Sequence, residues 1–384
     1  MISPNRGPHE IALVGADKHY FGGLAPADCG DYAAARGHQI YRCRWGGFEG
    51  NRKDKTMRAV VINEFGPVDS HDISEMPDPT AGPDEILIDV QAIGLNFPDT
   101  LMMQGLYQTR PDRPFVPGRD ASGVVTAVGE NVTRFKAGDR AVAQVRWGAY
   151  AEKLAAPVDR CFLLPDGMDF VGAAALGTVY PTAHVSLMLR GSYKEGEKVL
   201  VNGAGGGIGL AGVQIAKAKG ATVIAGDISE DKRQLALDNG ADHAIDLSVD
   251  DLRENLRRQV FAVTDNYGVD VCLDPVGGDV FDGALRALAF AGRIVTIGYA
   301  AGRIPEVKAN YFNVKNLTLA GVSLDLHFRY APETVVAAMA DLFDLYGQGK
   351  IKPEVTATFP MEDFKSALGM FAERKTKGKL VLTL

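Results

Sequence analysis

A run of small residues between a strand-like and a helix-like segment is the feature of this sequence that most directly indicates chemistry. Val201-Asn-Gly-Ala-Gly-Gly-Gly-Ile-Gly-Leu places Ala204, Gly206 and Gly209 at the three spaced positions of a dinucleotide fingerprint, with alanine where the first glycine is usual. Such a turn brings bare backbone and a helix N-terminus to a pyrophosphate. The alternative is a tight strand-to-helix turn with no ligand. The predicted cofactor-binding residues of the loop are Ala204, Gly205, Gly206, Gly207, Ile208 and Gly209.

Asp227 stands at the end of the next predicted strand, where an acid can accept both ribose hydroxyls of NAD and repel the 2′-phosphate of NADP. The alternative for Asp227 is an ordinary surface acid. Ser229, Lys232 and Arg233 follow directly and could hold a phosphate, although Lys232 and Arg233 could also form a solvated helix start. The sequence therefore predicts NADH or NADPH as the cofactor, with NADH slightly favoured by Asp227.

Two kinds of pattern surround the glycine run and predict two domains of the α/β class. Residues 57–180 show short alternating strands separated by Gly and Pro, which is typical of a β-rich, barrel-like domain. Residues 181–320 alternate strands with helices, and this order requires a doubly wound parallel sheet. In residues 321–384 a helix is expected after Pro332, and a last strand begins at Lys379. The clearest predicted strands are 85–92, 198–202, 222–226, 269–274 and 293–298, with helices at 207–219 and 230–239.

Length and composition limit the classes of function. A chain of 384 residues is long for one core, and its net charge of -7 argues against nucleic acid or an anionic membrane surface as a partner. No apolar run approaches the roughly 18 residues of a membrane span. Cys29, Cys43, Cys161 and Cys272 are widely spaced, which suits reduced thiols and a cytoplasmic location.

Residues 1–56 lack sustained strand or helix periodicity and differ in character from the rest of the chain. A clear strand pattern begins at Met57. We expect residues 1–56 to be a dispensable, poorly ordered extension, produced by translation upstream of a natural start at Met57. The alternative is a genuine small appendage.

Several motifs together resemble the medium-chain dehydrogenase/reductase superfamily, and within it the zinc-free quinone oxidoreductase (zeta-crystallin-like) branch. The resemblance covers residues 57–384. It implies a GroES-like catalytic domain built from residues 57–180 and 321–384, with a Rossmann domain inserted at 181–320 and the active site in the cleft. It also implies a homodimer. The motifs are Gly94-Leu-Asn-Phe-Pro-Asp-Thr, Gln104-Gly-Leu-Tyr, Pro114-Phe-Val-Pro-Gly, Asn202-Gly-Ala-Gly-Gly-Gly-Ile-Gly, Gly240-Ala-Asp-His, Asp274-Pro-Val-Gly-Gly and Gly378-Lys379.

The zinc ligands of the alcohol dehydrogenases in this superfamily have no counterparts here. The resemblance places Asn96 at the first ligand position and Arg119 at the histidine position, and neither is a zinc ligand. Cys29, His38 and Cys43 match no zinc spacing, and Cys161 and Cys272 are expected to be buried, inert thiols. We therefore expect no metal. A conjugated acceptor can react without a Lewis acid because its own carbonyl delocalises the incoming charge, whereas plain alcohol oxidation loses its activator.

The predicted activity is hydride transfer from NAD(P)H to a quinone or an α,β-unsaturated carbonyl compound. Tyr107 is the predicted proton donor, because a Tyr at the matching position has this role in related enoyl reductases; the alternative is a pocket wall. Asn96 is predicted to bind the cofactor ribose or the substrate. Asp99 could share that role or cap the following short helix. Arg119 could approach the substrate but is expected to pair with Asp120.

The remaining predicted contacts come from four other segments. Phe97, Leu101 and Leu106 are expected to form an apolar substrate wall, with Met102 as a further candidate and ordinary core as the alternative. Thr178 and Tyr180 lie at the domain crossing, where relatives touch the cofactor, although those relatives place Thr where this chain has Val179. Gly298 and Tyr299 follow a strand end. Lys379 reaches the cofactor or is a solvated strand start.

Three other functions remain open from the sequence. A 2-enoyl thioester reductase would need a channel and a basic entrance for its acyl carrier, and the sequence shows no obvious basic cluster. A non-catalytic dinucleotide-binding protein would bind the nucleotide without turnover. An alcohol dehydrogenase would require stoichiometric zinc.

Overall fold

The computed structural model describes residues 55–373 and 375–384. The prediction of a poorly ordered extension at 1–56 lies almost wholly outside the described residues, as do Cys29, His38 and Cys43. Strand β1 (Thr56–Val61) begins one residue before the expected strand start at Met57 and pairs with β2 (Asp72–Pro77). The described chain otherwise forms two large sheets, one mixed and one parallel.

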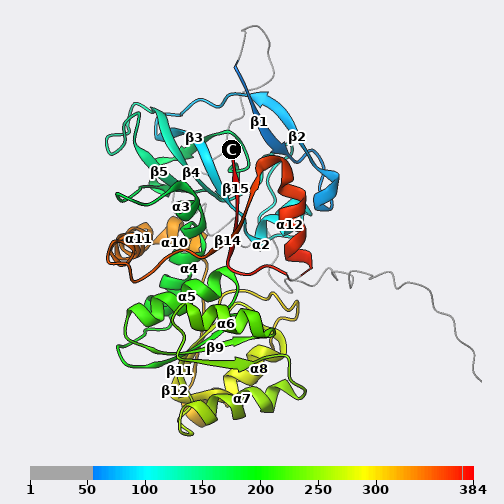
Figure 1. Ribbon diagram of the computed structural model, residues 1–384, viewed down its shortest axis with the longest axis vertical. Coiled ribbons are helices and arrows are strands. Elements are labelled where there is room, and N and C mark those ends of the chain that lie inside the picture. Colours follow the sequence, from blue (N-terminus) through cyan, green and yellow to red (C-terminus); the bar gives the residue numbers. More distant parts are fainter. Residues whose placement is uncertain (1–54, 374) are drawn as a thin grey trace, which may run out of the picture. The chain divides into compact units, whose positions relative to one another are not determined.

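The seven-stranded sheet joins the early part of the chain to its C-terminal end (Figure 1). Its order is β14-β15-β3-β4-β5-β7, and β6 also pairs with β3. Because β15 pairs antiparallel with β3 at Val381 and Gly94, the last strand completes the domain that the early strands begin. The strands are β3 (Glu85–Gly94), β4 (Asp120–Val128), β5 (Arg140–Gln144), β6 (Lys153–Pro157), β7 (Cys161–Leu163), β14 (Val355–Pro360) and β15 (Lys379–Thr383).

The six-stranded sheet is parallel throughout, in the order β10-β9-β8-β11-β12-β13. Its strands show a doubly wound arrangement, since Val199 and Val201 of β8 face one core while Leu200 between them faces another. Helices α5 and α6 cover the first face, and α7 and α8 cover the second (Figure 1). The strands are β8 (Lys198–Asn202), β9 (Thr222–Asp227), β10 (His243–Asp246), β11 (Val269–Asp274), β12 (Leu288–Thr296) and β13 (Thr318–Gly321).

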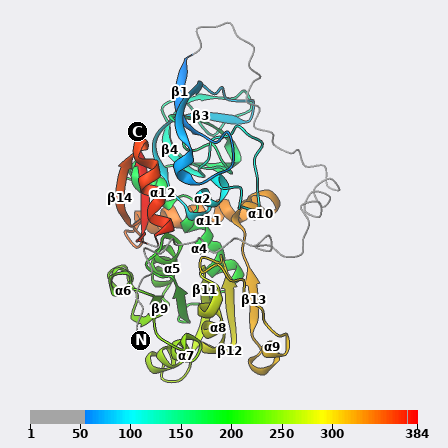
Figure 2. The ribbon, with the colours of Figure 1, turned by 90° about the vertical axis from the view of Figure 1, so that its right-hand side faces the viewer.

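The predicted helix ends are confirmed for the two helices that follow β8 and β9. Helix α5 (Gly207–Ala218) and helix α6 (Glu230–Asp238) each end just before a glycine in the left-handed region, Gly220 and Gly240. The remaining helices of this sheet are α7 (Leu252–Val263), α8 (Gly278–Ala287) and α9 (Asn310–Lys315), the last of which lies beside β12 and β13 in Figure 2.

Helices between and around the two sheets set the position of the candidate site. The chain crosses from the mixed sheet to the parallel sheet through α3 (Phe170–Leu176) and α4 (Val179–His184), which continues as a π-helix (Val185–Arg190). Helix α11 (Pro332–Gly347) packs on α4, and its start at Pro332 agrees with the prediction. The others are α2 (Phe97–Met103), α10 (Leu324–Tyr330) and α12 (Phe364–Ala372), together with short 3-10 turns at Val68–Ser70, Val158–Arg160 and Met361–Asp363.

Candidate active site

The glycine run forms the turn from β8 into α5, and its glycines meet two different demands. A Cβ on Gly209 would lie 2.1 Å from the carbonyl oxygen of Gly203, so only glycine allows the helix to pack this closely on the turn. A Cβ on Gly206 would meet a single described atom within 4 Å, the same carbonyl at 3.4 Å. The backbone at Gly206 is therefore open to a ligand at the N-terminus of α5, where N–H groups without helical partners face outward.

Asp227 lies beneath this turn and is 5% exposed. Its Oδ2 accepts the N–H of Gly205 at 2.9 Å, and its Oδ1 accepts the N–H of Ile228 at 2.8 Å. The carboxylate thus fixes the loop and still has a lone pair on each oxygen for a further donor. The alternative of an ordinary surface acid is wrong, because Asp227 is buried.

The residues after Asp227 are held in distinct ways. Ser229 is the N-cap residue of α6. The guanidinium of Arg233 donates to the carbonyl of Asp227 at 3.1 Å and to Asp246 at 3.0 Å, so this side chain already has partners within the protein. Lys232 packs its stem against the glycine turn, since a Cβ on Gly205 would lie 2.6 Å from the Cβ of Lys232. Arg233 is therefore a weaker phosphate ligand than the sequence suggested.

Lys379 links the glycine turn to the mixed sheet and is 4% exposed. Gly378 beside it donates its N–H to the carbonyl of Gly205 at 2.8 Å. The Lys379 stem passes the turn, since a Cβ on Gly207 would lie 3.0 Å from its Cδ. Its ammonium donates to the carbonyl of Leu95 at 2.6 Å and to Oδ1 of Asn96 at 2.8 Å. The alternative of a solvated strand start is wrong, because this lysine is buried where the two sheets meet.

Asp120 is the carboxylate at the centre of this network, and it is fully buried. It accepts Nδ2 of Asn96 at 2.8 Å and Oγ1 of Thr178 at 2.6 Å, and the Lys379 ammonium lies 4.0 Å away. Burial lowers the pKa of Lys379, and the charge of Asp120 opposes that shift. This role of Asp120 was not predicted from the sequence, which suggested the residue only as a partner for Arg119.

Asp99 and Tyr150 form a second buried pair next to this network. Tyr150 donates its hydroxyl to Oδ2 of Asp99 at 2.9 Å, and the same oxygen accepts the N–H of Asn96 at 3.0 Å. Asp99 thus caps α2 from inside its first turn, as one of the two predicted alternatives held. Burial raises the pKa of Asp99 to about 6, against the opposing charge of Arg119. Gly118, with φ +91°, leaves room for the Tyr150 ring, which a Cβ would meet at 2.0 Å.

The expected pairing of Arg119 with Asp120 is wrong. Arg119 stacks its guanidinium over the ring of Tyr107 at 4.9 Å, and Asp120 turns to Asn96 and Thr178 instead. The physical reason is that Asp120 is the first residue of β4, and neighbouring residues along a strand point to opposite faces. Arg119 and Tyr107 are therefore neighbours at the edge of the network.

The predicted apolar wall separates into exposed and buried members. Phe97 and Leu106 are exposed and Leu101 is partly exposed, so all three remain available to a ligand. Met102 is fully buried in the core of the mixed sheet, so it does not belong to a substrate wall. Tyr180 is also buried, and its hydroxyl has a structural partner, since it donates to Gln214 of α5 at 2.8 Å.

The loops after β11 and β12 lie against each other at the carboxyl edge of the parallel sheet. A Cβ on Gly298 would lie 3.3 Å from the carbonyl oxygen of Pro275, and a Cβ on Gly277 would lie 3.1 Å from the Tyr299 ring. Asp274, at the end of β11, accepts Nδ2 of Asn202 at 3.0 Å from the end of β8. Burial raises the pKa of Asp274 to about 6. Ligands of doubly wound sheets bind at this edge, and sequence reasoning had missed the Asn202–Asp274 pair.

Two protein-family models match this chain, one in the part that forms most of the mixed sheet and one in the part that forms most of the parallel sheet. Residues 82–186 match the model of the alcohol dehydrogenase GroES-like domain, and residues 207–344 match that of the zinc-binding dehydrogenase. A quinone oxidoreductase-like protein 2 homolog of Nematostella vectensis is 33% identical over 331 residues, which cover 85% of this chain and 89% of that protein.

Solved structures of oxidoreductases are similar to this chain over most of its length. The quinone oxidoreductase of Escherichia coli complexed with NADPH superimposes with a TM-score of 0.77 at 31% identity, over 85% of this chain and 100% of that one. The CurK enoyl reductase superimposes with a TM-score of 0.77 at 26% identity, over 86% of this chain and 99% of that one. In the described part of this chain, no helix is long and apolar enough to cross a membrane.

A zinc ion does not fit the donor groups of this site. At the expected ligand positions stand the amide of Asn96 and the guanidinium of Arg119, and the Lys379 ammonium already holds Oδ1 of Asn96. No group of three or more His, Cys, Asp or Glu suited to a metal occurs among residues 55–373 and 375–384. Cys161 and Cys272 are buried, and burial raises the pKa of both thiols. The residues at this site therefore do not supply the ligands that a catalytic zinc ion needs.

Proposed function

Since the chain belongs to the quinone oxidoreductase branch of the medium-chain dehydrogenase/reductase superfamily, we propose that it is a zinc-independent NAD(P)H-dependent reductase of quinones or α,β-unsaturated carbonyl compounds. The observation that carries the proposal is the contact between the open glycine turn and the buried Lys379–Asn96–Asp120 network. The contact supports the proposal because the turn that we expect to bind the nucleotide touches the buried polar groups that we expect to lie beside the acceptor.

The residues of the turn fit a nicotinamide dinucleotide. The backbone from Ala204 to Gly209 would hold the pyrophosphate, and Asp227 and Ser229 would hold the adenosine ribose. Lys232, Thr178, Gly298, Tyr299 and Lys379 are the other proposed contacts. When bound, the reduced cofactor supplies the hydride. The protein then has to orient the acceptor and stabilise the negative charge that develops on its oxygen.

Asn96 is better suited to positioning than to direct contact with the acceptor. Its side chain is 6% exposed, and its two polar atoms are used by Lys379 and by Asp120 with the carbonyl of Gly94. We propose that Asn96 fixes the Lys379 ammonium at the cofactor side of the cleft. This replaces the sequence-based expectation that Asn96 itself binds ribose or substrate.

Tyr107→Phe is expected to lower kcat for enones on the order of tenfold. The phenol would donate a proton to the reduced acceptor, and the partly exposed position lets a water replace it in part, which keeps the loss below the usual range for a general acid. Initial rates with an enone and a quinone measure the effect. Full activity of Tyr107→Phe on every good acceptor would leave Tyr107 only as a pocket wall.

Asp227→Asn is expected to raise the ratio of kcat/KM for NADPH over NADH by about tenfold. The substitution removes a buried negative charge that would repel a 2′-phosphate, and it retains one oxygen for the N–H of Gly205. Wild-type protein is expected to prefer NADH. An unchanged ratio in the variant would show that the charge at Asp227 does not select the cofactor.

The proposed function is tested by following oxidation of NADH and NADPH against a panel of quinones, enones and enoyl thioesters. Turnover of quinones or enones is expected. Nucleotide binding with no turnover across the panel would contradict the proposal and would favour a non-catalytic dinucleotide-binding protein. Turnover of thioesters alone would favour a 2-enoyl thioester reductase, the alternative supported by the similarity to the CurK enoyl reductase.

We also propose a homodimer in the cytoplasm, with domain boundaries near residues 180 and 320. The family suggests the dimer, and light scattering on the purified protein measures it. Limited proteolysis reports on the boundaries. No nucleic acid or membrane is proposed as a partner, given the net charge of -7.

A further inference from the structure

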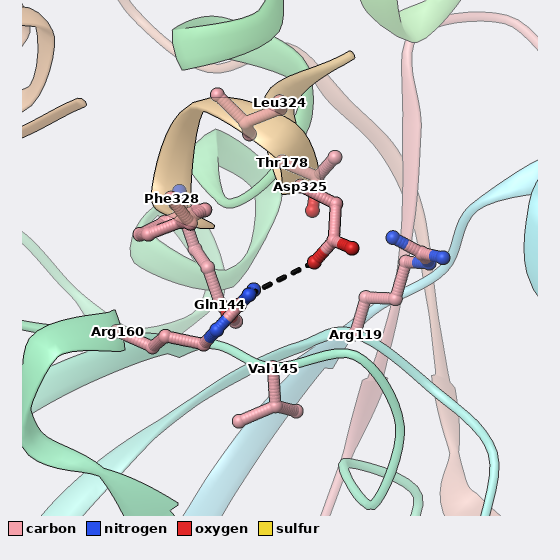
Figure 3. A pocket seen from close by; sticks show the side chains of 8 residues that line it. All are labelled: Arg119, Gln144, Val145, Arg160, Thr178, Leu324, Asp325 and Phe328. Carbon is pink, nitrogen blue, oxygen red and sulfur yellow. Dashed lines mark hydrogen bonds and ion pairs between the residues drawn. The ribbon is translucent and has the colours of Figure 1, made fainter. Parts of the chain in front are cut away.

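A pocket between the mixed sheet and α10 gathers arginines around one acid (Figure 3). Arg160 donates to Oδ1 of Asp325 at 2.9 Å, and Nε of Arg146 lies 3.3 Å from Oδ2 of the same carboxylate. Arg119 enters from the side of the pocket opposite Arg160. Two guanidinium groups therefore hold the Asp325 carboxylate, and the Arg119 side chain lines the same cavity, whose volume is about 20 Å³.

Two polar atoms in the wall of this pocket lack the partners that buried groups normally have. Nε of Arg119 and Oε1 of Gln144 are both buried with no hydrogen-bond partner among the described residues. A buried guanidinium N–H without an acceptor costs free energy unless a ligand oxygen supplies one. The Arg119 donor is thus the clearest sign that the pocket takes an anionic or carbonyl oxygen.

The neighbouring acids do not use up this positive charge. Asp120 is held by Asn96, Thr178 and Lys379, and Asp99 by Tyr150 and Asn96. Thr178, which donates to Asp120, also lines the pocket, so the arginines lie next to the network where we place the reaction. Phe328 and Leu324 close the apolar side, and the guanidinium of Arg160 lies 4.5 Å from the Phe328 ring.

We propose that this pocket binds a carboxylate of the acceptor, so that the substrate class is a conjugated carbonyl compound bearing a carboxylate. This rests on the proposed function and narrows its substrates. The Asp325 carboxylate, which pairs with Arg146 and Arg160, indicates which chemical group these guanidinium groups can hold. A substrate carboxylate would form charge-assisted hydrogen bonds with Arg119 and would share or displace Asp325 at Arg160.

The test compares trans-4-oxopent-2-enoate with its methyl ester, which differ only in the negative charge. The ratio of kcat/KM for acid over ester is expected to be about ten or more in the wild type and to fall about tenfold in Arg160→Gln and in Arg119→Gln, since each loses a charge-assisted hydrogen bond. Asp325→Asn is expected to raise the ratio, because it removes the competing carboxylate. Arg257→Gln, on α7, is the matched control and should leave the ratio unchanged.

Equal ratios in the wild type and the three pocket variants would overturn the carboxylate pocket while leaving the proposed reductase intact. If neither compound is reduced, the proposed function fails, and calorimetric binding of 4-oxopentanoate against its methyl ester decides the pocket separately. Preference for the acid, lost in Arg160→Gln, supports it, and equal binding contradicts it. Reduction of crotonyl-coenzyme A alone, with the same dependence on Arg160, would assign the arginines to a carrier phosphate instead.

Discussion

Lys379→Met is expected to lower the free energy of unfolding by about 3–5 kcal/mol, because it leaves a buried carboxylate without its cation. Asp120 is fully buried, and Lys379 lies 4.0 Å away with its ammonium fixed by Leu95 and Asn96. Removal of the ammonium also strands the carbonyl of Leu95 and the amide of Asn96. Urea unfolding of the wild type and the variant measures the loss.

Lys365→Met is the matched control for this experiment. Its ammonium pairs with Asp72 at 2.8 Å, but the two side chains are 34% and 80% exposed, so the pair should contribute less than about 1 kcal/mol. Adding Asp120→Asn to Lys379→Met should restore part of the lost stability, because the uncompensated charge disappears. If Lys379→Met costs no more than Lys365→Met, the network is not a buried charge pair and the account of Lys379 is wrong.

Gly206→Val is expected to raise the dissociation constants of NADH and NADPH by at least about a hundredfold, since two or more charge-assisted hydrogen bonds to phosphate would be blocked. The fold should remain, because the residue has an ordinary backbone conformation, with φ -87° and ψ 172°, and the space around its Cβ is open. Fluorescence titration with each reduced nucleotide and thermal unfolding measure the two effects separately.

Gly209→Ala provides the contrast within the same turn. Its Cβ would lie 2.1 Å from the carbonyl oxygen of Gly203, so the substitution should lower the free energy of unfolding by about 3 kcal/mol even in the absence of nucleotide. Nucleotide binding by Gly206→Val with wild-type affinity would show that the pyrophosphate does not lie on this backbone. The proposed role of the glycine turn would then have to be withdrawn.

The parts of the fold set by local pattern could be predicted from the sequence. Periodicity predicted the strand at 198–202, and glycine at helix ends predicted where the two helices before Gly220 and Gly240 stop. The alternation of strands and helices predicted that the second sheet is parallel. The strand at Lys379 was also expected, and the family resemblance placed it in the same domain as the early strands. Its antiparallel pairing with β3 was not predicted.

The centre of the site was not predictable in the same way. Asn96, Asp120, Thr178 and Lys379 come from four distant segments, and their meeting depends on β15 pairing with β3 and on the crossing after α3. No periodicity encodes such long-range contacts. The arginines near the pocket were not predicted for the same reason. Arg119, Arg146 and Arg160 are spread along the sequence, and Asp325 reaches them from α10, which lies much later in the chain.

Hydride transfer from a reduced nicotinamide nucleotide to a conjugated acceptor should proceed in this protein without a metal. The most direct measurement is the rate of NADH or NADPH oxidation with an enone or quinone, before and after exhaustive dialysis against a strong chelator, with the zinc content determined on the same samples. We expect an unchanged rate and a zinc content far below one ion per chain. Loss of the rate on chelation, with recovery on adding zinc, would contradict it.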